Sequence, residues 1–139
     1  MNFRKKIFLY KVKATTLFEL MVVMLILGIL ASYAVPEFTP LISKAKSQEA
    51  KAQLKFISNL EKQYFFINSK YSIDLDEIDF IEPKSVKDGG TANYQYEIIE
   101  ASTTNFTARA EAVVDFDGDG VFNVWEINQD GAPKEVVKD

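Results

Sequence analysis

The sequence predicts an α+β fold, in which a long N-terminal helix with an amphipathic outer half packs against a C-terminal antiparallel sheet of three to four strands. Three observations lead to this prediction. Residues 17–35 form an apolar run of 19 residues. Residues 41–70 repeat apolar side chains at three- and four-residue spacing, as one face of a helix does. Beyond residue 93, short segments rich in β-branched and aromatic residues alternate with turn signals, which is typical of strands.

The start of the chain predicts a membrane anchor. Residues 1–14 form a leader that contains five basic residues and no acidic one. As a helix rising about 1.5 Å per residue, the apolar run that follows nearly spans a hydrocarbon core of roughly 30 Å. Because basic residues are retained in the cytoplasm, we expect the N-terminus inside and the remainder of the chain outside.

The rest of the chain is predicted to form one globular domain. We expect its helix to continue the apolar segment, giving one nearly continuous helix from about Thr15 to Ser69. The buried stripe of its outer half is predicted to consist of Ala50, Leu54, Ile57, Leu60 and Tyr64. Strands are predicted at 93–101, 105–116 and 121–128, with 133–137 as a candidate fourth. The predicted domain map is therefore a leader (1–14), a membrane-anchor helix (15–36) and a globular domain (37–139).

The composition excludes several classes of function. The sequence has no cysteine and no histidine, which removes disulfides and every histidine-dependent catalytic arrangement. No nucleophile, base and orienting group stand out, so we predict that the protein is not an enzyme. Residues 71–139 contain 16 acidic and 5 basic residues. Such an acidic half argues against nucleic-acid binding, which requires a basic surface.

Glu19 is the one charged residue inside the apolar run. A carboxylate within hydrocarbon costs about 2.5–3.5 kcal/mol, so its presence calls for a reason. If the chain is cut between Ala14 and Thr15, a new α-amino group appears four residues before Glu19. The amine of a neighbouring copy would then be the natural partner of this carboxylate, in a low-dielectric bundle where charges interact strongly. We interpret Glu19 as a device that sets the register between identical helices.

The segment "KATTLFELMVVMLILGILASYAVPEF" resembles the cleavage and assembly segment of type IV pilins and the related pseudopilins. Ala14 stands just before the position of the prepilin cut, and Glu19 is the fifth residue after it. Gly28 and Pro36 fall where the family places a helix glycine and a helix-breaking proline. Two residues depart from the family pattern, which usually has Gly before the cut and Phe after it. Residues 37–80 resemble the outer half of the pilin helix and the connection that follows.

The resemblance implies a pilin-like fold and a structural role. A member of this family is made as an inner-membrane prepilin, cleaved here after Ala14 by a prepilin peptidase, and N-methylated on Thr15. It is then polymerised through its N-terminal helix, with the help of assembly machinery in the inner membrane, into a helical homo-oligomer. The implied function is a subunit of an extracellular type IV pilus-like filament, concerned with adhesion or motility. The major pseudopilin of a type II secretion system, in a periplasmic pseudopilus, is the alternative.

The sequence is also compatible with two other hypotheses about function and processing. The protein could be a monomeric, membrane-anchored calcium-binding module, which requires neither leader cleavage nor a polymer. The small residues of "SYA", 32–34, would also suit an ordinary secretory signal peptide cut after Ala34.

The stretch "DFDGDGVFNVWE", residues 115–126, has the ligand spacing of a calcium-binding EF-hand loop. Its flanks, however, read as strands, and an extended segment would carry Glu126 about 23 Å beyond Asp119. The alternative is a plain hairpin turn, because Asp-Gly is a strong turn signal. Three carboxylates within five residues nevertheless repel one another unless a cation lies among them. We predict a Ca²⁺ site with Asp115, Asp117 and Asp119 as ligands, Asn123 as a further candidate and Glu126 as a weaker one.

Overall fold

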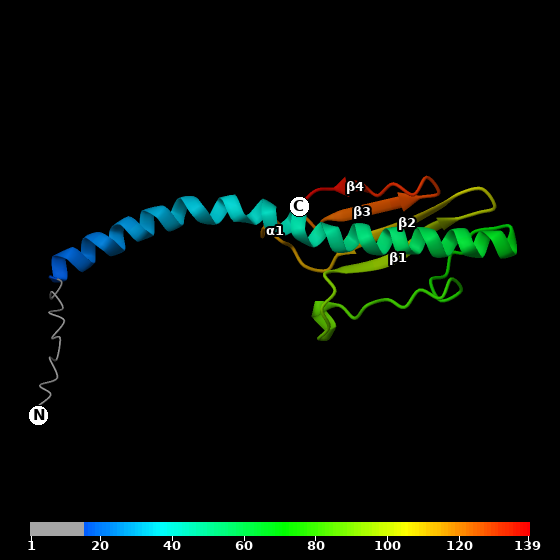
Figure 1. The fold of residues 1–139 in the computed structure, drawn as a ribbon, viewed down its shortest axis with the longest axis horizontal. Helices are drawn as coiled ribbons and strands as arrows, with labels where there is room; N and C mark the ends of the chain where they lie inside the picture. The colour runs from blue at the N-terminus through cyan, green and yellow to red at the C-terminus, as the bar shows by residue number, and fades with distance from the viewer. Residues whose placement is uncertain (1–15) are drawn as a thin grey trace, which may run out of the picture. The chain divides into compact units, whose positions relative to one another are not determined.

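The computed structural model describes residues 16–139 as one long helix followed by a four-stranded sheet (Figure 1). This confirms the predicted α+β, pilin-like fold. The predicted leader, and Thr15 with it, lies outside the described residues. The elements are α1 (Leu17–Asn68), the 3-10 helix η1 (Val86–Asp88), β1 (Tyr94–Ala101), β2 (Phe106–Ala112), β3 (Val124–Asn128) and β4 (Lys134–Val137).

The contacts within the chain divide it into two units, with the boundary in the sequence between Pro36 and Glu37. In the first unit, α1 is apolar and uncovered. Residues 16–34 are all exposed, and the segment Leu17–Ala34 has a mean hydropathy of 2.3 with none of it buried. By length and composition this segment is able to cross a membrane. The first part of α1 therefore presents apolar side chains that this chain does not cover within its described residues.

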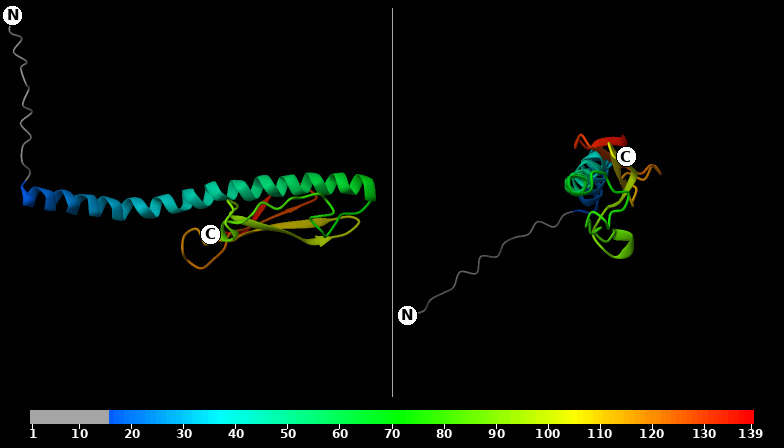
Figure 2. Two further views of the ribbon diagram at one scale, coloured as in Figure 1. Left: turned by 90° about the horizontal axis from the view of Figure 1, so that it is seen from below. Right: turned by 90° about the vertical axis from the view of Figure 1, so that its right-hand side faces the viewer.

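In the second unit, the outer half of α1 lies along one face of the sheet (Figure 2). Ala50, Leu54 and Ile57 are fully buried, and Leu60 and Tyr64 are partly buried against the same core. The predicted stripe is thus confirmed. Residues three and four positions apart share one side of a helix, so this stripe turns a continuous apolar edge toward the strands.

The sheet is an antiparallel meander in the order β1-β2-β3-β4. Buried and more exposed residues alternate along the first three strands, which places one face of each against α1. In β2 the inward residues after Phe106 are the small Ala108, Ala110 and Ala112, and they leave room for the helix above the middle of the sheet. All four predicted strands are present, although β2 ends at Ala112, four residues before the predicted limit, because the chain turns into the loop before β3.

Asn123 joins three strands at the end of the sheet. It is fully buried, and its side-chain oxygen accepts hydrogen bonds from the Tyr94 hydroxyl (2.8 Å) and the Trp125 indole N–H (2.6 Å). Its amide nitrogen donates to Glu135 Oε1 (2.8 Å) and to the Val137 carbonyl (3.0 Å). Because a buried amide left unpaired costs about 1–3 kcal/mol, this satisfied set of bonds fixes the strand ends beside the loop that follows β2.

Candidate assembly helix and metal site

Glu19 lies in the first turn of α1 and is exposed. Its backbone N–H donates to Thr16 Oγ1 (3.3 Å), as at a helix start. A carboxylate in this position is favoured by the positive end of the helix dipole. The ion pairs within residues 16–139 both involve Arg109, so Glu19 has no cationic partner in this part of the chain.

The other residues of the predicted assembly segment are placed as follows. Ala14 and Thr15, the predicted cleavage and methylation site, lie outside the described residues. Gly28 is exposed, and a Cβ added to it would meet no atom within 4 Å. Pro36 lies within α1, which continues through it to Asn68. The positions of Glu19 and Gly28 are therefore open to a neighbouring molecule.

The loop between β2 and β3 is folded around Asp115. Its carboxylate accepts hydrogen bonds from the backbone N–H groups of Gly118 (2.5 Å), Gly120 (2.7 Å) and Asp117 (3.2 Å). These bonds, with that of Gly118 the strongest, lower the pKa of Asp115. Gly118 and Gly120 have φ of 85° and 87°, in the left-handed region that glycine favours. The Asp-Gly repeats thus wrap the loop around one ionised side chain.

Asp139 is a member of this site that the sequence analysis missed. Carboxylate oxygens of Asp115, Asp117 and Asp139 all lie within 4.8 Å of one another, close enough to hold one metal ion. Asp139 Oδ2 accepts the backbone N–H of Phe116 (2.9 Å), and Figure 1 shows the chain ending beside this loop. Asp139 Oδ1 is buried and has no hydrogen-bond partner in the described structure. Burial, and then the charges of the neighbouring aspartates, raises the pKa of Asp139.

The structure does not bring the remaining predicted ligands into this cluster. Asp119 is not a member of the close group, and its Oδ1 accepts the Val121 N–H (2.7 Å). Asn123 is committed to the bonds described above, which corrects its nomination as a ligand. Glu126 lies in β3, as expected from the predicted strand, and its Oε1 accepts two bonds from Arg109 (3.0 and 2.8 Å). An EF-hand arrangement, which requires a helix there, is therefore excluded.

Glu61 is a buried carboxyl group that the sequence analysis did not single out. It lies on the buried face of α1 with no exposed surface. Its Oε2 accepts the Ser72 N–H (3.1 Å), whereas its Oε1 is buried without a partner in the described chain. Burial raises the pKa of Glu61 to about 7, and the nearby charge of Glu77 adds to this effect. Its spacing of four residues after Ile57 could have revealed it, because that places it on the predicted apolar stripe.

Comparison with known proteins gives two relatives. No protein-family model matches the sequence. Over 65 residues, 47% of this chain, it is 42% identical to the type IV major pilin protein PilA of Myxococcus xanthus (strain DK1622). Over 83 residues, 54% of this chain, it is 36% identical to the type II secretion system core protein G of Aeromonas hydrophila. The matches cover 30% and 58% of the lengths of these relatives, less than two thirds of either.

Glu61 predicts a pH dependence of folding stability. The folded state binds the Glu61 proton more tightly than the unfolded state, whose ordinary glutamate pKa is about 4.3. The stability that the protonated Glu61 contributes is therefore fully present below about pH 4.3, and it is lost as the pH rises through about 7. We expect Glu61→Gln to remove a decline of about 3–4 kcal/mol in the free energy of unfolding, so that the variant is more stable than the wild type at pH 8.

Urea unfolding of the full chain in detergent measures this effect, because Trp125, the one tryptophan, reports on the globular unit. Glu111→Gln, at an exposed position of β2, is the matched control and should keep the wild-type decline. Identical pH profiles for wild type and Glu61→Gln would show that Glu61 is not the responsible group.

Proposed function

The chain belongs to the family of type IV pilins and type II secretion pseudopilins, and from this premise we propose that it is a structural, non-catalytic subunit of a type IV pilus-like filament. In this proposal it is made as an inner-membrane prepilin with its N-terminus in the cytoplasm. A prepilin peptidase removes the leader after Ala14, and Thr15 is N-methylated. Assembly machinery in the inner membrane then polymerises the subunit through its N-terminal helix, and the filament is extracellular.

The observation that carries this proposal is the uncovered apolar part of α1. None of the segment Leu17–Ala34 is buried in the described structure, and it includes one carboxylate without a cationic partner there. Lipid can cover the apolar side chains but gives Glu19 no counter-charge. A bundle of identical helices would bury the apolar side chains and also pair the charge of Glu19, since the Thr15 amine of one copy can meet Glu19 of the next in a low-dielectric environment.

A periplasmic pseudopilus of a type II secretion system is the second candidate. The relative from Aeromonas hydrophila is named as a core protein of that system, and its match covers more of both chains than the match to the pilin. Both candidates use the same helix bundle. A filament on the cell surface supports the pilus, whereas a requirement for protein export without a surface filament supports the pseudopilus.

The first prediction concerns processing. We expect the mature chain to start at Thr15, because the basic leader ends immediately before it and Glu19 follows at the fifth position. Intact-mass analysis of the assembled protein identifies its first residue. Methylation of Thr15 would increase the measured mass by that of one methyl group. A mature chain that starts at Val35 would favour a secretory signal peptide, and a chain that retains Met1 would favour a monomeric anchor.

The second prediction concerns Glu19. Glu19→Ala should insert into the membrane at least as well as the wild type, because it removes a charge from hydrocarbon. Filament yield should fall tenfold or more, since an ion pair in a packed bundle is worth several kcal/mol and about 1.4 kcal/mol is a factor of ten. Sheared-filament yield and membrane content are measured together, with Met24→Ala as a control that shortens a side chain of the same helix. Normal filament yield from Glu19→Ala would remove its role in assembly.

We further propose that the acidic cluster binds Ca²⁺ through Asp115, Asp117 and Asp139. The fit rests on the buried, unpartnered Oδ1 of Asp139 beside two other carboxylates. Carboxylate oxygens are the ligands that calcium prefers, and a bound ion would neutralise their mutual repulsion. The ion would also link the loop after β2 to the segment that follows β4, in a domain that has no disulfide.

Calcium should therefore stabilise the globular unit. A hundredfold excess over Kd contributes about 2.7 kcal/mol, which should raise the melting temperature by roughly 10 °C or more. Melting with calcium or with chelator, followed by Trp125 fluorescence, measures the shift. Asp117→Asn with Asp139→Asn should abolish the shift. Glu126→Gln should retain it, and so should Asp119→Asn, because Asp119 lies outside the close cluster. A melting curve indifferent to millimolar calcium would leave the loop as a turn.

A further inference from the structure

We infer that two grooves near opposite edges of the sheet, one acidic and one basic, form a contact between copies of this chain in which the acidic groove of one copy receives the basic groove of the next. The inference rests on the proposed filament and deepens it, because it names a second subunit contact in addition to the helix bundle. Both grooves belong to the globular unit.

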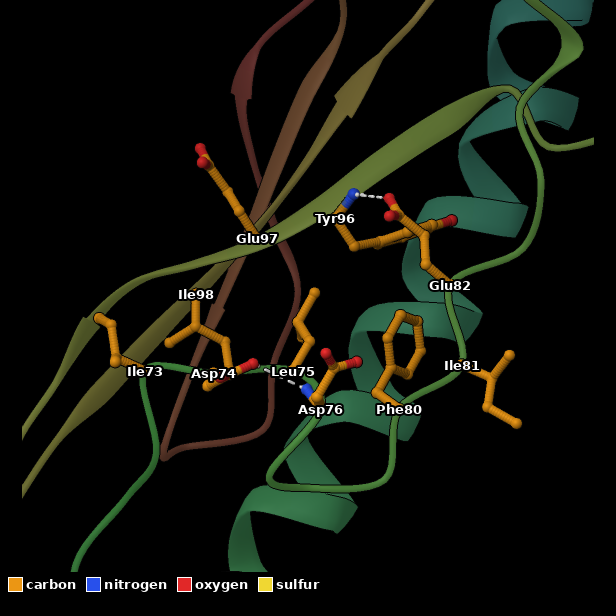
Figure 3. A pocket seen from close by; sticks show the side chains of 10 residues that line it. All are labelled: Ile73, Asp74, Leu75, Asp76, Phe80, Ile81, Glu82, Tyr96, Glu97 and Ile98. Carbon is orange, nitrogen blue, oxygen red and sulfur yellow. Dashed lines mark hydrogen bonds between the residues drawn. The ribbon is translucent and has the colours of Figure 1, made fainter. Parts of the chain in front are cut away.

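The acidic groove is a cavity of about 620 Å³ between the connection after α1 and strand β1 (Figure 3). Its rim carries Asp74, Asp76 and Glu82, and its apolar part includes two strongly exposed side chains, Ile73 (62%) and Ile81 (90%). Glu82 is held in place by the Tyr96 N–H (3.0 Å). A solvated charged surface has no need of such exposed isoleucines, whereas a docking surface gains from covering them.

The charge of this groove is largely uncompensated within the chain. Glu97, at the border of the groove, does have an ion-pair partner: its Oε1 lies 3.7 Å from Arg109 Nη1. Arg109 makes its shorter bonds to Glu126 instead. Asp74, Asp76 and Glu82 form no ion pair among the described residues.

The basic groove lies on the other side of α1, against β3. It is a hollow of about 600 Å³ that includes Lys51 and Lys55 of α1 and the ring of Trp125. Lys51 Nζ lies 4.2 Å from the centre of that ring. Lys62, seven residues after Lys55, continues the same side of the helix. None of these lysines is ion-paired within residues 16–139, so this face offers positive charge around an apolar centre.

The two grooves match in position as well as in charge. Strand β1 is one edge of the sheet and β4 is the other, with β3 next to β4. Tyr96, which lines the acidic groove, pairs with Ala110, and Ala110 pairs with Trp125 of the basic groove, so the grooves lie at the same level of the sheet. Because they lie near opposite edges of the sheet, the charges of the two grooves cannot pair with each other within one copy.

A second copy of the chain is therefore the occupant that the charges select. When the acidic groove of one copy meets the basic groove of another, the first copy keeps its basic groove free and the second keeps its acidic groove free. Such a heterologous contact does not close on itself as a two-fold dimer does, and it extends into an open helical assembly when its rotation does not close a ring, as the proposed filament requires. Opposite charges across the contact would also favour one register over others, because like charges in contact cost several kcal/mol.

Charge reversal on each side tests the contact. Asp74→Lys with Asp76→Lys, and separately Lys51→Glu with Lys55→Glu, should each lower the yield of sheared filaments tenfold or more. A one-to-one mixture of the two variants, co-expressed in one cell, should recover filaments that contain both. Urea unfolding followed by Trp125 fluorescence shows that each variant folds. Wild-type yield from both folded variants, or no recovery in the mixture, would overturn the inference.

Crosslinking gives an independent test, because the chain contains no cysteine of its own. In filaments of the variant with Ile81→Cys and Lys55→Cys, a bismaleimide linker should produce a ladder of covalent oligomers. Each single cysteine variant, and the control pair Lys55→Cys with Thr104→Cys, should not extend beyond dimers. If filaments form and the first pair gives no ladder, the inference fails and the proposed filament stands. If no filament forms even from the wild type, the proposed function itself fails.

Discussion

The apolar surface of the first half of α1 is the constraint on which the account depends. Eighteen consecutive residues, Leu17–Ala34, are uncovered in the described structure. Burying one large apolar side chain contributes about 1.5–3 kcal/mol, so this surface strongly favours any environment that removes it from water. In the proposed filament, lipid would do so before assembly and neighbouring helices would do so afterwards. Glu19 distinguishes the two environments, because only an environment with a positive partner compensates its charge.

In the globular unit, the same helix buries only one side, which packs against the sheet. Beyond Glu37 its apolar residues narrow to a stripe, and the sheet covers that stripe through small residues in β2 and aromatic residues in β1 and β3. The domain has no disulfide, and polar groups hold its two ends instead. Asn123 ties strands β1, β3 and β4 together at one end, and the Glu61 carboxyl accepts the Ser72 N–H at the other. The charged residues around this core are separated by sign: lysines lie on α1, and carboxylates lie along the connection from α1 to β1.

Local patterns could be predicted from the sequence, and long-range pairings could not. The helix stripe and the four strands follow from spacing and residue type, which depend on neighbours a few positions away. The role of Glu126 was also constrained locally, since an extended segment carries it away from the loop. Asp139 was missed because nothing in its own surroundings shows that the last strand returns to Asp115 and Asp117. Asn123 was misassigned for the same reason: its partners come from three strands, and a ligand motif cannot reveal that its oxygen is already occupied.

Electron cryomicroscopy of filaments sheared from cells, with mass spectrometry of their main protein, tests the central claim most directly. The account predicts a filament made of this chain, with the apolar parts of α1 packed together in its core and density joining each Glu19 to the first residue of a neighbouring subunit. A filament whose core helices leave Glu19 without a cationic neighbour would contradict the role of this residue. The chain recovered only as a monomer in the membrane fraction, under conditions where the assembly machinery is present, would contradict the account as a whole.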